Sequence, residues 1–214
     1  MSEDTPYPAA EDIHRICLDL GFEVEDDAAD RLARYVGLLA KWNRAVNLVG
    51  PEHWRDIFTD LVADSLHLHR FLAGLDHAAE PLCLDLGAGA GLPGIPLRIL
   101  WPEGNYHLIE PRRKRALFMR TVLGELKLPG TFVFHGRAED ADFVGADLIL
   151  SRAFLPWPRL LPFARPMLSL AGRVVVLASE PAPEPAPEGW ELLDCADYPA
   201  GKETRYFWGL APAS

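Results

Sequence analysis

The sequence predicts an α/β fold in which a mainly parallel sheet carries helices on both faces and follows an N-terminal helical cap. From Leu82 onward, short apolar runs alternate with segments of helical periodicity, which is typical of parallel strands joined by crossover helices. Before this point, apolar residues recur at steps of three and four, as they do along amphipathic helices. We therefore expect a helical cap over residues 1–78 that packs on a sheet domain over residues 79–214.

The cap is expected to contain three helices, of which the central one has the clearest pattern. Its apolar residues, including Leu32, Val36 and Leu39, fall on one face, and its basic residues fall on the others. We interpret this apolar stripe as a packing surface against the sheet domain and not as a binding face. The expected helices cover residues 12–20, 25–48 and 54–72.

The sheet domain is expected to contain five parallel strands, three crossover helices and a closing antiparallel pair. The parallel strands cover residues 82–86, 105–109, 131–135, 147–151 and 172–178. The helices cover residues 92–100, 112–128 and 159–168. The closing pair covers residues 190–194 and 205–210. Prolines alternate through residues 181–187, which predicts an extended surface loop.

The first strand of the sheet domain ends in a run of glycines. Gly87, Gly89 and Gly91 allow the backbone to turn tightly and to approach a ligand without side-chain clashes. With Asp85 just before it, this G-x-G-x-G spacing is the pattern of S-adenosylmethionine-dependent methyltransferases with a Rossmann-like fold. A second spacing, closed by Gly94, matches the G-x-G-x-x-G fingerprint of dinucleotide-binding enzymes. A nicotinamide-dependent oxidoreductase therefore stays open as an alternative.

Further candidate residues stand at the carboxyl ends of later strands, where open α/β sheets bind their ligands. Glu110 ends the second strand, where a carboxylate can accept hydrogen bonds from both hydroxyls of an adenosine ribose. Ala138 and Glu139 follow the third strand, where the adenine edge is bound in such a fold. Arg152 ends the fourth strand and is expected to point into the ligand crevice. The alternatives are a surface carboxylate for Glu110 and an ion pair with a loop acid for Arg152.

The dense basic cluster of the chain begins directly after the second strand and consists of Arg112, Arg113, Lys114 and Arg115, with Arg120 beyond them. The formal net charge of the chain is −10, which argues against a protein that coats nucleic acid through bulk attraction. A local cluster in an acidic chain fits contacts with RNA phosphates. The alternative is a solvated helix face.

Several classes of protein and of site are not expected. No apolar run approaches the ~20 residues of a membrane span, so no membrane association is predicted. Cys17, Cys83 and Cys195 are far apart and lack metal-binding spacing, which indicates a reducing cytoplasm and no metal site. No residue is predicted to act as a catalytic acid, base or nucleophile. We expect a cytoplasmic monomer.

Beyond these patterns, the chain resembles a known family over about residues 30–178. The resemblance rests on motifs that follow one another in family order: Asp64-Ser65-Leu66, the glycine turn continued by Leu92-Pro93-Gly94-Ile95-Pro96, Arg137-Ala138-Glu139 and Ser151-Arg152-Ala153-Phe154. These motifs are similar to those of the bacterial small-subunit rRNA guanine-N7 methyltransferases, the RsmG or GidB family.

The resemblance implies a class I methyltransferase fold, S-adenosyl-L-methionine as the cofactor and small-subunit (16S) rRNA, free or in the ribosomal small subunit, as the partner. The methylated base would be one guanine in the decoding-region loop. It also implies cofactor contacts at Gly87, Leu92, Ala138, Glu139 and Arg152.

Three positions depart from the family pattern. Val49 stands where a threonine is usual, Leu61 where a histidine is usual, and Ala178 where a lysine is usual. All three lie near where the substrate, and not the cofactor, would be bound. A methyltransferase with a different substrate and a non-catalytic ribosome-associated module therefore remain alternatives.

Overall fold

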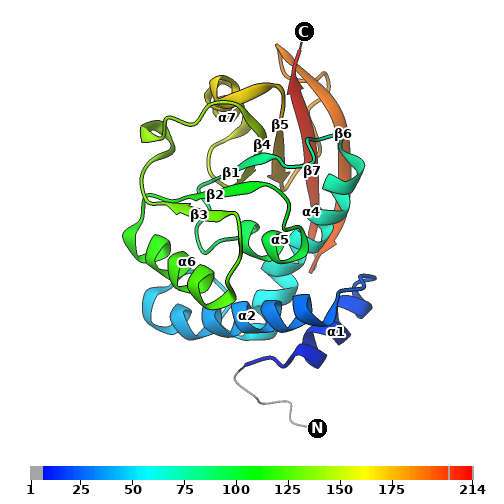
Figure 1. Cartoon of the computed structure of the whole chain (residues 1–214). Coiled ribbons are helices and arrows are strands. Elements are labelled where there is room, and N and C mark those ends of the chain that lie inside the picture. Colours follow the sequence, from blue (N-terminus) through cyan, green and yellow to red (C-terminus); the bar gives the residue numbers. More distant parts are fainter. Residues whose placement is uncertain (1–6, 202, 214) are drawn as a thin grey trace.

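The computed structural model describes residues 7–201 and 203–213 of the chain and contains a seven-stranded sheet in the order β3-β2-β1-β4-β5-β7-β6 (Figure 1). The strands are β1 Leu82–Leu86, β2 Asn105–Ile109, β3 Thr131–Phe134, β4 Ala146–Arg152, β5 Leu168–Ala178, β6 Trp190–Ala200 and β7 Glu203–Pro212. Strands β1 to β5 pair in parallel, and β7 inserts antiparallel between β5 and β6. The predicted fold class is confirmed.

The chain reverses its direction of travel across the sheet between β1 and β4. From β1 it winds outward to β2 and β3, and then returns to pair β4 with the other side of β1. Such a switch point leaves a crevice at the carboxyl ends of the two central strands. The glycine turn follows β1, so it opens onto this crevice.

Four helices and a π-helical segment precede the sheet, and the remaining helices connect its strands. The helices are α1 Ala10–Asp19, α2 Asp26–Val46, α3 Trp54–Ile57, the π-helical η1 Phe58–Val62, α4 Ala63–Gly74, α5 Gly94–Leu100, α6 Arg113–Leu126, the 3-10 helix η2 Ala138–Asp140, α7 Trp157–Ala164 and the 3-10 helix η3 Arg165–Met167. Figure 1 shows α2 running beside α6 on one side of the sheet, with α7 at the opposite end of the view. Among the described residues, no helix has both the length and the apolarity needed to span a membrane.

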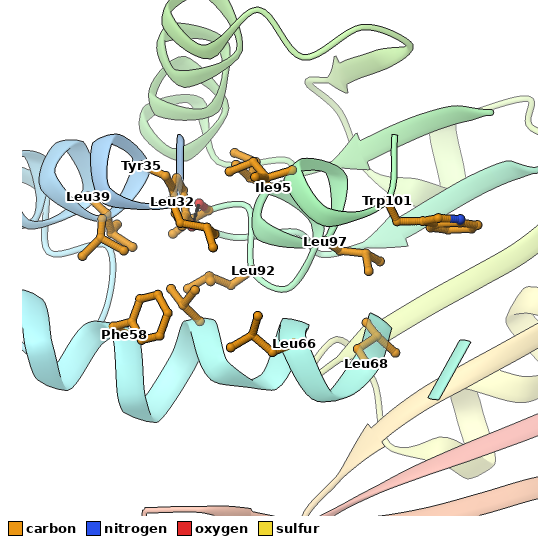
Figure 2. Close-up of a cluster of buried hydrophobic side chains, with 14 of the residues drawn as sticks. Leu32, Tyr35, Leu39, Phe58, Leu66, Leu68, Leu92, Ile95, Leu97 and Trp101 are labelled. Atoms are coloured by element: carbon orange, nitrogen blue, oxygen red, sulfur yellow. Dashed lines mark hydrogen bonds between the residues drawn. The ribbon is translucent and has the colours of Figure 1, made fainter. Parts of the chain in front are cut away.

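The two faces of the sheet bury separate hydrophobic clusters. On β1, Cys83 belongs to a large cluster that includes the N-terminal helices and α5 and α6, whereas Leu84 and Leu86 belong to a smaller cluster under α7. Burial on both faces explains why four of the five residues of β1 are apolar. Figure 2 shows the large cluster, with Leu32 of α2, Leu66 of α4 and other apolar side chains gathered around α5.

The predicted elements are all found, but some of their bounds differ. The helix expected over residues 54–72 is α3 and α4 joined by the π-helical η1. The largest difference is β6, which extends to Ala200 and not to residue 194. Its outer part contains Asp197 and Pro199, which have low strand propensity, and it forms a strand because it pairs with β7 at the edge of the sheet.

The division of the chain into a cap over residues 1–78 and a sheet domain over residues 79–214 stays a prediction. The large hydrophobic cluster runs without a break from Ile13 to Phe207, so both parts contribute to one core. Residues 1–6, 202 and 214 lie outside the described residues.

A buried carboxylate lies beneath the start of α5. Asp85 is 1% exposed, and its carboxylate accepts a long hydrogen bond of 3.4 Å from the Tyr106 hydroxyl. Burial raises the pKa of Asp85 to about 7, although Arg152, Tyr106 and the Gly94 backbone act in the opposite direction. A Cβ atom added at Gly94 would lie 2.5 Å from Asp85 Oδ2 and 2.9 Å from Tyr106 Cε1. Gly94 is therefore a packing glycine.

We predict that Gly94→Ala destabilises the protein and that Gly124→Ala does not. The new methyl group at residue 94 has no space, and such overpacking costs about 1–3 kcal/mol. Gly124 lies in α6 with no atom within 4 Å of its added Cβ, so alanine should stabilise the helix by about 0.5–1 kcal/mol. Urea unfolding measures both changes. Equal free energies of unfolding for the two variants would contradict the packing role of Gly94.

We also predict a pH-dependent difference between the wild type and Asp85→Asn. Because the folded-state pKa of Asp85 is raised above its unfolded value, the stability tied to its proton is present below about pH 4 and is lost as pH rises through about 7. Asparagine has no proton to lose. The wild type should therefore lose about 2 kcal/mol of unfolding free energy relative to the variant between pH 5 and pH 7. Urea unfolding at both pH values tests this, and a constant difference would show that Asp85 keeps an ordinary pKa.

Candidate functional site

The glycine turn after β1 has one face closed by packing and one face open. Gly87, Gly89 and Gly91 have φ values of +73°, +60° and +82°, which L side chains rarely adopt. A Cβ atom would meet Phe154 at Gly87 and Ile95 at Gly91. At Gly89 the nearest side-chain atom to an added Cβ lies 3.7 Å away, so the backbone there can be approached closely by a ligand.

Three other parts of the chain hold this turn in place. The backbone N–H groups of Gly87 and Ala88 both donate to the Ile109 carbonyl at 3.0 Å, which ties the turn to β2. The buried Tyr35 hydroxyl of α2 donates to the Ala90 carbonyl at 2.9 Å. The Ser65 hydroxyl of α4 donates to the Pro93 carbonyl at 3.0 Å. The N-terminal helices therefore position the turn directly.

Glu110, at the end of β2, is buried and joins the turn to α6. Its Oε2 accepts a hydrogen bond from the Gly89 N–H at 3.0 Å, and its Oε1 accepts one from the Arg112 N–H at 2.8 Å. Arg115 Nη1 lies 3.9 Å from Oε2. Glu110 is 3% exposed, so it is not the surface carboxylate that the sequence left open as an alternative. A carboxylate has about four lone-pair sites, and these two backbone bonds leave acceptor capacity at both oxygens.

The other residues predicted to contact the methyl donor lie at the same edge of the sheet. Ala138 and Glu139 form part of η2 after β3, with Ala138 buried and Glu139 exposed. Leu92 is buried in the large hydrophobic cluster, so its side chain packs and its backbone continues the turn. The turn, Glu110 and Arg115 are in direct contact, and Ala138 and Glu139 lie two strands away from β1.

Arg152 takes part in a buried ion cluster that the sequence did not predict. Its Nη1 lies 2.9 Å from Oδ2 of Asp64, a residue of α4 that is 1% exposed. Arg205 of β7 donates to both Asp64 oxygens at 2.9 and 2.7 Å, and the Tyr198 hydroxyl of β6 donates to Oδ1 at 3.1 Å. Burial raises the pKa of Asp64, and the two guanidinium groups and the Tyr198 hydroxyl oppose that rise. The partner of Arg152 is therefore a helix acid and not a loop acid.

A cavity of about 530 Å³ opens beside this ion cluster, at the carboxyl ends of β4 and β5. Ligand pockets in proteins commonly measure about 300–1,000 Å³. Leu61 and Ala178, two of the positions that depart from the family pattern, both line it. The remaining lining residues come from α4, the end of β4, the segment after it, the start of α7, the end of β5 and the residues after it, and the two C-terminal strands: Asp64, Ser151, Arg152, Ala153, Leu155, Pro156, Trp157, Pro158, Val176, Leu177, Ser179, Glu180, Tyr198, Arg205 and Trp208.

The predicted basic cluster lies at the exposed start of α6. Arg112, Arg113 and Lys114 are exposed, and within residues 7–201 and 203–213 none of the three forms a salt bridge. Helix α6 runs antiparallel to α2, because Arg34 donates to the Glu125 carbonyl at 3.0 Å near one end of the pair and the Trp42 and Phe118 rings lie 5.6 Å apart farther along.

The basic cluster therefore lies near the carboxyl end of α2. A second cavity of about 490 Å³ opens there, lined by Ala40, Asn43, Arg44, Asn47, Gly50 and Glu52. Val49, the third departure from the family pattern, follows α2, and its N–H donates to the Asn43 side chain at 2.9 Å.

Sequence reasoning missed Asp64, Tyr198 and Arg205 as members of the site. Asp64 belongs to the motif Asp64-Ser65-Leu66, so its place in that motif was an available signal. No local pattern marks Tyr198 or Arg205. They reach the site because β7 pairs with β5 and β6 pairs with β7, which extends the sheet beyond β5.

Comparisons with known proteins agree with this architecture. The protein ribosomal RNA small subunit methyltransferase G of Nitratidesulfovibrio vulgaris is 47% identical over 203 residues, which cover 94% of this chain and 93% of the relative. The protein of the same name from Oleidesulfovibrio alaskensis is 43% identical, with 95% of each chain covered. Among solved structures, a mutant of MtNAS in complex with S-adenosylmethionine is similar with a TM-score of 0.60 at 14% identity, and the match covers 96% of this chain and 78% of that one.

At this low identity the structural likeness concerns the fold alone. The family assignment rests on the sequence. The profile of the GidB family, described as rRNA small subunit methyltransferase G, matches residues 28–186, and with the two relatives above this match shows that the chain belongs to that family.

Proposed function

We propose that this protein transfers a methyl group from S-adenosyl-L-methionine to N7 of a guanine in the decoding-region loop of small-subunit rRNA. The observation that carries the proposal is the juxtaposition of the open, braced glycine turn with the cavity at the ends of the two strands beyond β1. Membership of the rRNA methyltransferase family makes the chain a methyltransferase that acts on rRNA. The identity of the base and the roles of individual residues are our proposal.

The turn and its neighbours suit the methyl donor. Gly89 offers backbone without a side chain, and Glu110 keeps acceptor capacity for the ribose hydroxyls. Ala138 and Glu139 would contact the adenine, and Arg152 would border the end of the donor nearest the cavity. When bound, S-adenosyl-L-methionine supplies an electrophilic methyl group on a sulfonium centre.

Methylation of guanine N7 requires mainly that the protein position the base and the methyl donor relative to each other. Guanine N7 has an in-plane lone pair and no proton to lose, so its methylation needs no general base. The buried acid that lines the cavity, Asp64, is suited to a structural role, because both of its oxygens already accept hydrogen bonds from Arg152, Arg205 or Tyr198. The site would act by aligning the base with the methyl group and by excluding water.

The basic cluster would hold the RNA. Arg112, Arg113 and Lys114 are exposed and project from the end of α6 next to Glu110, which ties the backbone of Arg112 to the glycine turn. Cations there could contact phosphates while the target base enters the cavity, as a base splayed out of single-stranded RNA can.

The alternatives receive less support. Gly94 would be the third fingerprint glycine of a nicotinamide-dependent oxidoreductase, and its packing against Asp85 and Tyr106 is compatible with either kind of turn, so it does not favour that alternative. The named relatives do not favour an oxidoreductase or a non-catalytic module. We also propose a cytoplasmic location, since Cys17, Cys83 and Cys195 are all free thiols. The monomeric state stays a prediction from the sequence.

We predict labelled 7-methylguanine in small-subunit rRNA when the protein is incubated with labelled S-adenosyl-L-methionine and subunits from cells that lack this activity. Nuclease digestion and mass spectrometry would identify the modified base and its position. A Gly89→Val variant is the matched control and should give little label, because a branched side chain at a φ of +60° is strained and covers the open face of the turn.

Label on another nucleotide or another RNA would move the proposal to a different substrate of the same chemistry. Binding of NAD(H) in a fluorescence titration, with no affinity for S-adenosyl-L-methionine, would replace the methyltransferase proposal by the oxidoreductase.

We further predict that Glu110→Ala weakens donor binding by about tenfold to a hundredfold, because it removes a buried carboxylate that accepts charge-assisted hydrogen bonds. Binding of small-subunit RNA should change by less than about threefold. Calorimetric titration of the donor and filter binding of the RNA measure the two affinities. Glu125→Ala, at an exposed position of α6, is the control and should alter neither. Equal losses of donor and RNA binding would remove Glu110 from the ribose role.

A further inference from the structure

Resting on the proposed function, we propose that Glu180 and Trp157 recognise the target guanine in the 530 Å³ cavity. The Trp157 indole would stack on the purine, and the Glu180 carboxylate would accept hydrogen bonds from the guanine N1–H and 2-amino group. These two residues would make the cavity specific for guanine over adenine, whose corresponding edge presents an acceptor at N1 and no 2-amino group.

The order of the strands sets the direction in which the base must lie. The donor turn follows β1, Arg152 ends β4, and Glu180 follows the end of β5, so these groups succeed one another across the edge of the sheet. In guanine, N7 and the edge that carries N1 and the 2-amino group are on opposite sides of the purine. With N7 directed toward the donor turn, that other edge is directed toward β5 and β7.

Glu180 is the acidic group available at that end of the cavity. Of the two acids that line it, Asp64 is saturated by Arg152, Arg205 and Tyr198. The Glu180 carboxylate, by contrast, forms no salt bridge or side-chain hydrogen bond within the part of the chain that the structure describes.

The backbone of Glu180 is nevertheless held in place. Its carbonyl accepts a hydrogen bond of 3.1 Å from the indole Nε1 of Trp208, a residue that is 1% exposed. Glu180 thus has a fixed backbone and an exposed side chain whose carboxylate is free among the described residues. An ionised carboxylate can accept two parallel N–H donors such as those of guanine.

Trp157 provides the stacking surface. It is the first residue of α7, lines the cavity and is only partly buried, whereas Trp208 is fully buried in the wall. Unpaired bases are commonly bound by stacking on aromatic side chains, which contributes about 1–3 kcal/mol per base.

The charges around the cavity support the same assignment. Methylation at N7 makes the purine cationic, and the cavity is lined by two guanidinium groups, Arg152 and Arg205. Asp64 offsets one of them, and Glu180 offsets the other. Without Glu180 the lining would carry a net positive charge that opposes the cation formed during transfer, while the face of the Trp157 indole attracts it.

The first test compares Glu180→Gln with the wild type in methyl transfer to small subunits. Glutamine keeps the shape of the side chain but turns one acceptor into a donor that faces a guanine donor. We expect kcat/KM for subunits to fall by about tenfold to a hundredfold, with donor affinity and melting temperature unchanged. Glu188→Gln, at an exposed position of the same loop that does not line the cavity, should behave as the wild type. Activity of Glu180→Gln within twofold of the wild type would overturn the proposal.

The second test ties the effect to the base itself. Subunits are reconstituted with rRNA in which the mapped guanine is replaced by inosine, which lacks the 2-amino group. The replacement should lower kcat/KM of the wild type by about tenfold and that of Glu180→Gln by less than threefold, since the two changes remove the same contact. If the loss caused by inosine and the loss caused by Glu180→Gln multiply in full when the two changes are combined, Glu180 does not contact the edge of guanine that carries the 2-amino group.

A third variant tests the stacking surface. Trp157→Leu should lower kcat/KM by about tenfold or more, and Trp157→Phe should recover most of the activity because it keeps an aromatic face. Equal activity of the two variants would remove Trp157 from the proposal. A wild-type protein that methylates no subunit RNA would instead contradict the proposed function, so the two failures are distinguishable.

Discussion

The hydrogen bonds that fix the glycine turn are the interaction on which the site depends. The turn has positive φ angles at three glycines and follows a strand that is buried on both faces, so by itself it could adopt several paths. Three groups each form hydrogen bonds with a different part of the turn: the Ile109 carbonyl, the Tyr35 hydroxyl and the Glu110 carboxylate. Because Tyr35 belongs to α2, the N-terminal helices help to fix the glycine turn as well as forming part of the core. A rigid turn matters for a reaction that relies on alignment and not on a catalytic base.

The Asp64 ion cluster fixes the side chains beside the cavity at the ends of β4 and β5. It joins α4, β4, β6 and β7 through one buried carboxylate. A buried ion pair is a weak argument for stability, because removing charges from water is costly. Here the Asp64 carboxylate, as their shared acceptor, restricts where Arg152 and Arg205 can point, and both arginines border the cavity. The cluster therefore has a geometric role: it keeps two cations beside the cavity, whose other acid, Glu180, takes no part in the cluster.

Local features of the sequence were sufficient to predict the fold and the places of the glycine turn and Glu110 in it, and insufficient to predict the cavity. The bounds of β1 and β2 match the prediction because each strand has a clear end, at Gly87 for β1 and at Glu110 for β2. The glycine turn and Glu110 are recognisable because they occupy fixed places at the ends of consecutive strands. The partners of Asp64 lie 88 to 141 positions away in the sequence, and their meeting depends on the antiparallel return of β6 and β7. The outer part of β6 could not be predicted either, because pairing with β7, and not its own composition, makes it a strand.

The sheet divides the site into two halves with different constraints. The half that we propose for the methyl donor lies at β1 and β2, where the chain keeps the motifs of the family, and where Gly87, Gly91 and Gly94 leave no space for a Cβ atom. The other half is the cavity at β4 and β5, and Leu61 and Ala178, which depart from the family pattern, are in its wall. Side chains there face open space, so their identity can change without disturbing the turn. A small side chain at residue 178 and an apolar one at residue 61 place no further charge in the cavity. The balance between its two arginines and two acids therefore depends on Glu180, the acid that has no other partner among the described residues.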